Sequence, residues 1–379
     1  MAVQIIPTLG KKAGWITDLH VVDSNFEVLE KVFTFMIEKF KGAGVDFIVI
    51  TGDIFDKKNN TKGTEYSFFS RWLKKFLEIG PVIMTVGNHD YCIEHTVHTL
   101  ERYTYVPGVY VVDEQAIMGD HLFLSFCRNE ARFDALVGEA LEVCPDLKYL
   151  WGHFDCDGFD LSGTGKEEIG HWSATNKFAG FYEVNSGHYH KRQEKKVKWS
   201  DSIKESRELS EGQKDYTTVT YLGTSYTESR SEANQEKFIA VVNMETCEKE
   251  FIKTPFTLHK RVKLKLEDGL PEELPEDADS VDYAYEVTMN SDQLKSLTLP
   301  PHLEGRVIPR TAEDSLKRLD IDLSESTEAI LEKYTNYKCE RLYGKDASKW
   351  PVDAKALVRK GLAYASKSLQ SETDPQESA

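Results

Sequence analysis

The fold of this chain is decided by the sequence DFIVITGD, residues 46–53, in which a short apolar run ends at a glycine and a carboxylate. Such a run predicts a buried strand that leads into a polar loop. The pattern also occurs before it, at residues 12–18 (KAGWITD), and after it, at residues 81–90 (PVIMTVGNHD). The connecting residues 25–41 and 64–78 have apolar side chains at helical spacing. This alternation predicts α/β layering.

Later in the chain, short apolar runs predict further strands and therefore a second sheet. They occupy residues 109–112, 121–126, 149–151, 183–186, 218–222 and 238–243. We expect an α/β fold, a two-sheet β-sandwich flanked by helices, followed by a small α+β cap and C-terminal helices.

Composition predicts a soluble globular protein, with 379 residues of which 40% are hydrophobic and 29% charged. No apolar stretch approaches the roughly 18 residues that cross a bilayer, so no membrane partner is expected. The N-terminus places its apolar run before its lysines, the reverse of a secretory signal, which predicts a cytoplasmic protein. The six cysteines are scattered without a C-x-x-C pair, which argues against a disulfide scaffold or a zinc ribbon.

The formal net charge is −16. This value is unfavourable for a nucleic-acid enzyme, since non-specific DNA affinity comes mostly from Lys and Arg that meet phosphate. Either the negative charge lies far from the active face, or a partner supplies the affinity. Much of the negative charge is local, in the acidic stretch 267–286.

Five short motifs end or follow predicted strands, where the carboxyl ends of strands in α/β sheets bind ligands. They are Asp18-Leu19-His20, Gly52-Asp53, Gly87-Asn88-His89-Asp90, Gly152-His153 and Gly187-His188-Tyr189-His190. Each fragment alone is weak, because Gly-Asp and Gly-His pairs occur by chance and single histidines are usually surface or core residues. All five in order, each at a strand end, favour one shared site at one edge.

These residue types suit two divalent cations. Carboxylates, an amide oxygen and imidazoles without thiolate fit Mn, Fe or Zn better than Ca or Mg alone. Asp53 is the natural bridge, and a metal-bridging hydroxide could attack phosphorus in line. His89 is left over once the ligands are counted, so it could stabilise charge or protonate the leaving oxygen, with Asp90 orienting its imidazole.

These motifs resemble the calcineurin-like metallophosphoesterase family, whose pattern is D-x-H, GD, GNH[DE], GH and GHxH. Within the family, GDIFD at residues 52–56 and GNHD at residues 87–90 look like the SbcD-type nuclease subunits of DNA repair and recombination complexes. GHFDCDGF at residues 152–159 and YLGTS at residues 221–225 are similar to the nuclease subunits of tailed phages. The resemblance covers roughly residues 11–260.

The resemblance implies two metal sites that share one carboxylate, with manganese as the leading metal and Mg, Fe or Zn as alternatives. One site would use Asp18, His20, Asp53 and His190, and the other Asp53, Asn88, His153 and His188. It also implies His89 as the catalytic histidine.

Three further residues are weaker candidates for substrate contact, namely Tyr189, Lys191 and Arg192. Tyr189 lies between two predicted ligands, and the other two begin the charge-dense segment 191–217. This segment either contacts phosphates or forms a solvated hairpin.

The domain boundaries follow from the resemblance and from a change of composition near residue 261. We expect a metallophosphoesterase (nuclease) domain at 1–260, a small capping domain at 261–310 and a disordered tail at 370–379. The helical region 311–369 either binds an ATPase partner or packs on the core of this chain.

The leading hypothesis is a Mn-dependent DNA exonuclease and endonuclease, the subunit of an SbcCD-like double-strand-break repair or recombination complex. Its partners would be DNA and an SbcC-like coiled-coil ATPase, since the chain has no Walker A sequence; the resemblance also allows a homodimer and a phage-infected bacterial host. One alternative is a phosphomonoesterase or cyclic-nucleotide phosphodiesterase. Another is a non-catalytic scaffold that tethers an ATPase.

Overall fold

The computed structural model describes residues 3–160, 177–206 and 214–311. The described residues divide into two compact units, of which the larger holds those up to Arg261 together with Glu276–Tyr283, and the smaller holds Val262–Pro275 and residues 284–311. Residues 276–283, expected in the capping domain, therefore group with the larger unit. The expected helical region beyond residue 311 and the tail lie outside the described residues.

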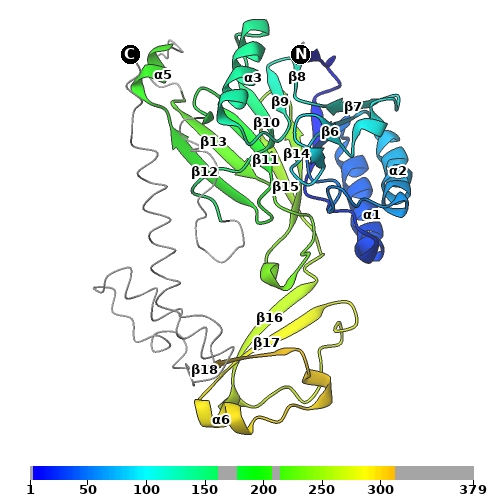
Figure 1. Ribbon diagram of the computed structural model, residues 1–379, viewed down its shortest axis with the longest axis vertical. Coiled ribbons are helices and arrows are strands. Elements are labelled where there is room, and N and C mark those ends of the chain that lie inside the picture. Colours follow the sequence, from blue (N-terminus) through cyan, green and yellow to red (C-terminus); the bar gives the residue numbers. More distant parts are fainter. Residues whose placement is uncertain (1–2, 161–176, 207–213, 312–379) are drawn as a thin grey trace, which may run out of the picture. The chain divides into compact units, whose positions relative to one another are not determined.

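The first sheet of the larger unit contains the strands that lead into the first three motifs (Figure 1). Its six strands run in the order β15 (Lys249–Lys253), β14 (Phe238–Asn243), β2 (Lys12–Ile16), β3 (Phe47–Thr51), β4 (Val82–Thr85) and β7 (Val109–Val112). The last four strands of this order are parallel, whereas β14 pairs antiparallel with both of its neighbours. The strand ends of β2, β3 and β4 are therefore adjacent.

Two helices cover one face of this sheet, α1 (Phe26–Ala43) and α2 (Gly63–Leu77). In α1, apolar side chains at helical spacing are buried: Leu29, Val32, Phe33, Met36 and Phe40. The helix ends at Gly44, whose φ of 65° is a left-handed conformation that glycine adopts without a steric penalty. Its amide donates to the Lys41 carbonyl oxygen at 3.2 Å.

The second sheet has seven strands and contributes the last two motifs. Their order is β1 (Gln4–Ile5), β8 (Gln115–Met118), β9 (His121–Leu124), β10 (Tyr149–His153), β11 (Glu183–Gly187), β13 (Tyr216–Tyr221) and β12 (Gln193–Lys198). The helix α3 (Glu130–Val143) packs on its outer face and begins at Asn129, whose side chain accepts a hydrogen bond from the Arg132 amide. Sequence patterning did not predict α3.

The two sheets pack face to face over a shared apolar core. Alternate residues of β3 face in opposite directions: Phe47 and Val49 join this shared core, whereas Ile48 and Ile50 pack against the helices. At its centre the rings of Trp15 and Trp151 meet edge to face, with centroids 5.5 Å apart. The two-sheet sandwich predicted from the sequence is confirmed.

The remaining elements are short. They are β5 (Tyr91–Ile93), β6 (Val97–His98), α5 (Asp201–Ser206), and the 3-10 helices η1 (Asp23–Asn25), η2 (Glu101–Tyr103) and η3 (Arg230–Glu232). In the segment 191–217, β12 pairs antiparallel with β13 at the sheet edge, and residues 207–213 lie outside the described residues. In the described part of the chain, no helix is both long and apolar enough to cross a membrane.

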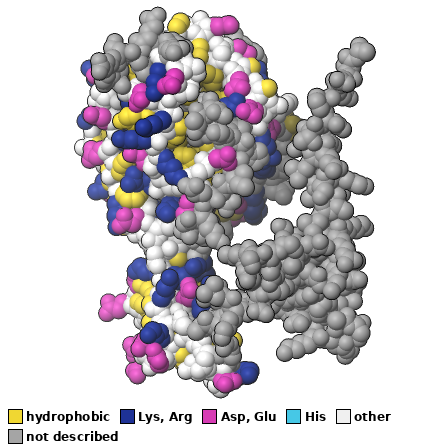
Figure 2. All heavy atoms as spheres, turned by 90° about the vertical axis from the view of Figure 1, so that its left-hand side faces the viewer, with side chains coloured by type: hydrophobic (Ala, Val, Ile, Leu, Met, Phe, Trp, Pro, Cys, Tyr) yellow, Lys and Arg dark blue, Asp and Glu magenta, His cyan; other side chains and the backbone are white. Residues whose placement is uncertain are grey.

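The smaller unit combines strands and short helices. Strand β17 (Asp282–Met289) pairs parallel with β18 (Val307–Thr311) and lies beside β16 (His259–Lys265) in a three-stranded sheet, accompanied by α6 (Ser291–Ser296), η4 (Leu266–Asp268) and η5 (Pro301–Leu303). The face shown in Figure 2 mixes Lys and Arg with Asp and Glu instead of gathering one sign of charge.

Trp151→Ala should destabilise the protein by about 3–5 kcal/mol, because it removes a fully buried indole from between the two sheets. Chemical denaturation followed by circular dichroism measures the change. Tyr105→Ala is the control, because its side chain is 85% exposed and should change the free energy of unfolding by less than about 0.5 kcal/mol. Equal losses for the two variants would contradict a core at Trp151.

Candidate metal centre

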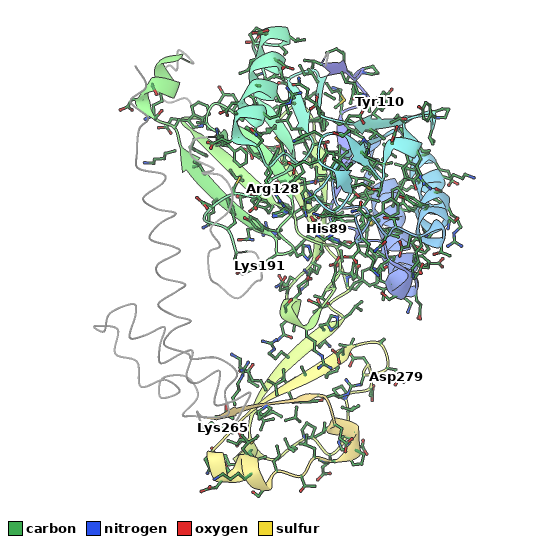
Figure 3. All side chains as sticks on the ribbon, in the orientation of Figure 1. His89, Tyr110, Arg128, Lys191, Lys265 and Asp279 are labelled. Atoms are coloured by element: carbon green, nitrogen blue, oxygen red, sulfur yellow. The ribbon has the colours of Figure 1, made fainter. Side chains whose placement is uncertain are left out.

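Five strand ends meet at one end of the sandwich, where Figure 3 labels His89 on the loop that follows β4. The motifs after β2, β3 and β4 come from the six-stranded sheet, and those of β10 and β11 from the seven-stranded sheet. The sequence predicted that all five motifs lie at one edge of a sheet, whereas in the structure they come from two sheets. The groups meet because two sheets pack face to face and end at the same place.

The first group of side chains surrounds Nε2 of His20. This atom lies 3.2 Å from Nε2 of His190, 3.8 Å from Oδ2 of Asp53 and 4.0 Å from Oδ1 of Asp18. Burial lowers the pKa of His20 to about 3, so this imidazole is neutral at physiological pH and can offer a lone pair. Asp18, His20 and His190 form one compact set of metal-ligand atoms.

The second group surrounds Nε2 of His153. This atom lies 2.9 Å from Oδ1 of Asn88 and 3.2 Å from Oδ2 of Asp53, while Oδ1 of Asn88 is also 2.9 Å from Nδ1 of His188. Oδ2 of Asp53 therefore lies between the two groups. The structure brings together all seven residues that the sequence proposed as ligands.

The donor set fits divalent cations. Nδ1 of His153 lies 2.9 Å from the Thr51 carbonyl oxygen, which only accepts, so Nδ1 carries a proton and Nε2 points at two further acceptors. Burial lowers the pKa of His153, but the Asp53 carboxylate more than offsets this and raises the pKa to about 9. The surroundings thus favour positive charge at this point, as a cation would supply.

The profile of the calcineurin-like phosphoesterase family matches residues 12–199. These residues belong to that family. The family uses two divalent metals, and the described residues supply candidate ligand groups for them. The chain is therefore a metal-dependent phosphoesterase.

Solved structures that match this chain include a novel archaeal phosphodiesterase, at 14% identity over 64% of this chain and 99% of that chain, with a TM-score of 0.32. A dimetal phosphatase from Danio rerio is 10% identical over 64% of this chain and 98% of its own, with a TM-score of 0.33. No curated protein matches the chain.

Four residues of the phosphoesterase site adopt positive φ angles that side chains other than glycine rarely take: Asp18 at 50°, His20 at 44°, Asp53 at 51° and His188 at 97°. Hydrogen bonds between the loops hold two of them. The Asp18 amide donates to the Gly52 carbonyl oxygen, and the His20 amide to the Asp53 carbonyl oxygen, both at 3.1 Å. The strained backbone turns these side chains towards the shared site.

His89 lies at the rim of the two groups. Its amide donates to Oδ1 of Asp53 at 2.8 Å, its Nδ1 is 2.6 Å from the Asp56 carbonyl oxygen, and its ring meets His20 edge to face with centroids 5.0 Å apart. Because Nδ1 is held by an acceptor, Nε2 is the nitrogen free to meet a substrate. The site residue that fixes this imidazole is Asp56, in the GDIFD stretch, and it was not predicted.

Asp90 has a different role from the predicted one. Its carboxylate is fully buried and accepts the amides of Ile54, Phe55 and Gly87 at 3.0–3.1 Å. Among the described residues it makes no hydrogen bond to His89. The prediction that Asp90 orients the imidazole is therefore wrong; Asp90 ties the loop after β3 to the loop after β4.

Two residues that sequence reasoning missed support His190. Nδ1 of His190 lies 2.9 Å from Oε1 of Glu232, and Oε2 of Glu232 accepts from Nζ of the buried Lys237 at 2.7 Å. Nζ of Lys237 also donates to the His190 carbonyl oxygen at 2.8 Å. Neither residue lies in a motif, and 42 positions separate Glu232 from His190, so no sequence signal pointed to them.

The three weaker substrate candidates have other partners. The Tyr189 side chain is buried, with its hydroxyl 2.7 Å from the Cys156 carbonyl oxygen, so the expectation that it faces substrate is not met. Lys191 pairs with Asp160 at 3.3 Å. The Arg192 guanidinium lies over the rings of two phenylalanines, Phe238 and Phe251, at 5.0 and 4.4 Å.

Gly87→Ala should abolish metal binding and activity while the protein still folds. A Cβ at this position would lie 2.2 Å from both the amide nitrogen and Oδ1 of Asp53, so the central carboxylate would have to move. Metal analysis after dialysis and a phosphoesterase assay measure the losses. Gly138→Ala, in α3 with no atom within 4 Å of the added Cβ, is the matched control and should keep both.

Glu232→Gln should weaken binding of one metal equivalent by about 10–100-fold, because a neutral amide holds the His190 imidazole less firmly than a carboxylate. Isothermal titration with Mn²⁺ measures the affinity. Glu236→Gln removes a carboxylate four positions away that pairs with Lys253 on the surface, and should leave both equivalents unchanged. Wild-type affinity in Glu232→Gln would refute its support of His190.

Proposed function

We propose that this phosphoesterase is a Mn-dependent DNA nuclease, with exonuclease and endonuclease activity, that works in an SbcCD-like double-strand-break repair or recombination complex. The observation that carries phosphoester hydrolysis is His89, anchored through Nδ1 beside two converging groups of ligand atoms. The choice of DNA as substrate rests on the stretches that resemble nuclease subunits, GDIFD at residues 52–56 and GNHD at residues 87–90.

The metals, when bound, supply a nucleophilic hydroxide and stabilise charge on the phosphoryl oxygens. Asp18, His20, Asp53 and His190 would hold one ion, and Asp53, Asn88, His153 and His188 the other. His89 is not one of these metal ligands. With Nδ1 fixed by the Asp56 carbonyl oxygen, a proton on Nε2 can stabilise the phosphate or pass to the leaving oxygen.

One side of the centre is open to solvent. Asp18, Asp53 and His153 are buried, whereas Asn88, His89, His188 and His190 are partly exposed. A phosphodiester would therefore approach from the side of the loops that follow β4 and β11, where it meets His89. An open approach suits a polymer better than a closed pocket would.

Affinity for DNA would come largely from a partner. The chain carries a net charge of −16, the surface in Figure 2 mixes both signs, and Lys191 is already paired with Asp160. An SbcC-like coiled-coil ATPase would supply both DNA affinity and ATP hydrolysis, for which the chain has no Walker A sequence. The proposed complex also includes a second copy of this chain, which would form a homodimer.

The same negative charge favours a second candidate, a phosphomonoesterase or cyclic-nucleotide phosphodiesterase, because a small substrate does not need a long basic surface. This candidate keeps the metals and the role of His89, so only the choice of substrate separates the two. A scaffold without catalysis is the third candidate, and the convergence of all seven ligand residues argues against it.

Purified protein with Mn²⁺ should cleave end-labelled linear DNA, and circular single-stranded DNA as an endonuclease. Gel electrophoresis of the products measures cleavage, with p-nitrophenyl phosphate and cyclic nucleotides as competing substrates. His89→Ser should lower cleavage by about 10²–10⁴-fold and keep both metals, since only the rim imidazole is removed. Asp53→Asn should lose cleavage together with metal occupancy, because it removes the central charge.

Hydrolysis of the small substrates without any cleavage of DNA, with or without an ATPase partner, would reject the nuclease and leave the phosphoesterase. Loss of metals in His89→Ser would show that this residue is a ligand instead of an acid. A wild-type protein without activity on any phosphoester would favour the scaffold.

A further inference from the structure

A second cluster of metal-ligand side chains lies beside the GNHD loop and shares no residue with the centre described above. Glu94 and His95 connect β5 to β6, and Cys127 follows β9 in the chain. One ligand atom from each of these three side chains lies within 4.8 Å of the others. Nε2 of His95 is 3.4 Å from Oε1 of Glu94, close to the ~3.3 Å that bonds of about 2.05 Å to a tetrahedral zinc would give.

His95 is the unusual member of this cluster. Both of its ring nitrogens are buried, and neither has a hydrogen-bond partner among the described residues. Its backbone φ is 60°, in the left-handed region that residues other than glycine rarely adopt. Buried ring nitrogens without a hydrogen bond and a strained backbone are both unfavourable, and they persist where a structure needs them for another purpose.

We propose that Glu94, His95 and Cys127 bind a third divalent cation, of the zinc class, that is structural instead of catalytic. Thiolate, imidazole and carboxylate are all zinc ligands, and the thiolate selects zinc over the manganese that suits the oxygen-rich centre. The cation would satisfy one ring nitrogen of His95. The other, Nδ1, faces Oε1 of Glu114 at 4.0 Å.

The charges balance at such a site. The Cys127 thiol lies 3.2 Å from the Asn129 carbonyl oxygen, and burial raises the pKa of this thiol to about 11. Binding of the cation therefore releases the thiol proton to solvent and leaves a thiolate. One thiolate and the Glu94 carboxylate together neutralise a charge of +2.

The cation would join two loops that border the catalytic centre. The hairpin of β5 and β6 leaves the GNHD loop directly, and the Thr99 amide at its end donates back to the Asp90 carbonyl oxygen at 2.9 Å. On the other side, the Phe126 amide donates to the Val86 carbonyl oxygen at 2.8 Å, and the Phe126 ring stacks on His188 with centroids 6.2 Å apart. A link between Cys127 and the hairpin would hold both loops in register.

Cobalt separates this site from the catalytic pair, because only a cobalt–thiolate bond gives a charge-transfer absorption in the near ultraviolet. Full-length protein, freed of metal by a chelator in the presence of a reductant, is titrated with Co²⁺. We expect this absorption at one equivalent per chain, also in Asp53→Asn, where the catalytic ions are lost. Zn²⁺ should abolish the absorption by displacement.

Cys127→Ser should remove the absorption, and His95→Gln should remove it or weaken Co²⁺ binding at this site by at least about tenfold. His95→Gln changes a hairpin side chain and tests the site even if the buried Cys127→Ser fails to fold, which circular dichroism shows. The matched control is Cys144→Ser, a half-buried thiol at the end of α3 that should keep the absorption. The proposal is overturned by no absorption in the wild type, by its persistence in Cys127→Ser, or by an unchanged absorption and Co²⁺ affinity in His95→Gln, as it is by loss of the absorption in Cys144→Ser.

Discussion

The Asp53 carboxylate is the constraint on which the site depends. It is almost fully buried, and a buried carboxylate is unfavourable unless it is surrounded by positive charge or hydrogen-bond donors. Its Oδ1 accepts the His89 amide at 2.8 Å, and its Oδ2 lies 3.2 Å from Nε2 of His153 and 3.8 Å from Nε2 of His20. One side chain thus connects loops from both sheets. Burial raises the pKa of Asp53, but His153 more than offsets this, so the group stays ionised.

This arrangement requires backbones to approach one another closely, and the glycines of the motifs meet that requirement. A Cβ on Gly87 would overlap Asp53, and a Cβ on Gly187 would lie 2.0 Å from Oγ1 of Thr17 and 2.5 Å from the Thr51 carbonyl oxygen. The rigid core holds the strand ends in place against this crowding. The Trp15 indole donates to Oγ1 of Thr51 at 2.9 Å, one residue before the GD motif, and thereby fixes the end of β3. The strained angles at the site persist because the packed strands hold them.

The sequence predicted those parts of the protein that local pattern determines. The strands at residues 109–112 and 238–243 were predicted to the residue, and the ligands converge because each follows a strand. Contacts between segments far apart in the chain could not be predicted from local pattern. Glu232 supports His190 across 42 positions, and Asp90 binds backbone amides instead of its neighbour His89, because an amide nest offers a buried carboxylate more donors than one imidazole does. Tyr189 is a third such case, because its side chain is buried in the core although it lies between two ligand residues in the chain.

The two halves of the centre are supported by different means. His153 is oriented by the carbonyl oxygen of Thr51, which belongs to β3, so its position is as firm as the sheet. His190 is oriented by the Glu232 carboxylate, which in turn depends on the buried ammonium of Lys237. Removing either partner of such a buried pair leaves the other charge uncompensated, whereas a backbone carbonyl cannot be mutated away. The half that contains His20 and His190 is therefore more open to change by substitution, and the half that contains His153 is fixed by the fold itself.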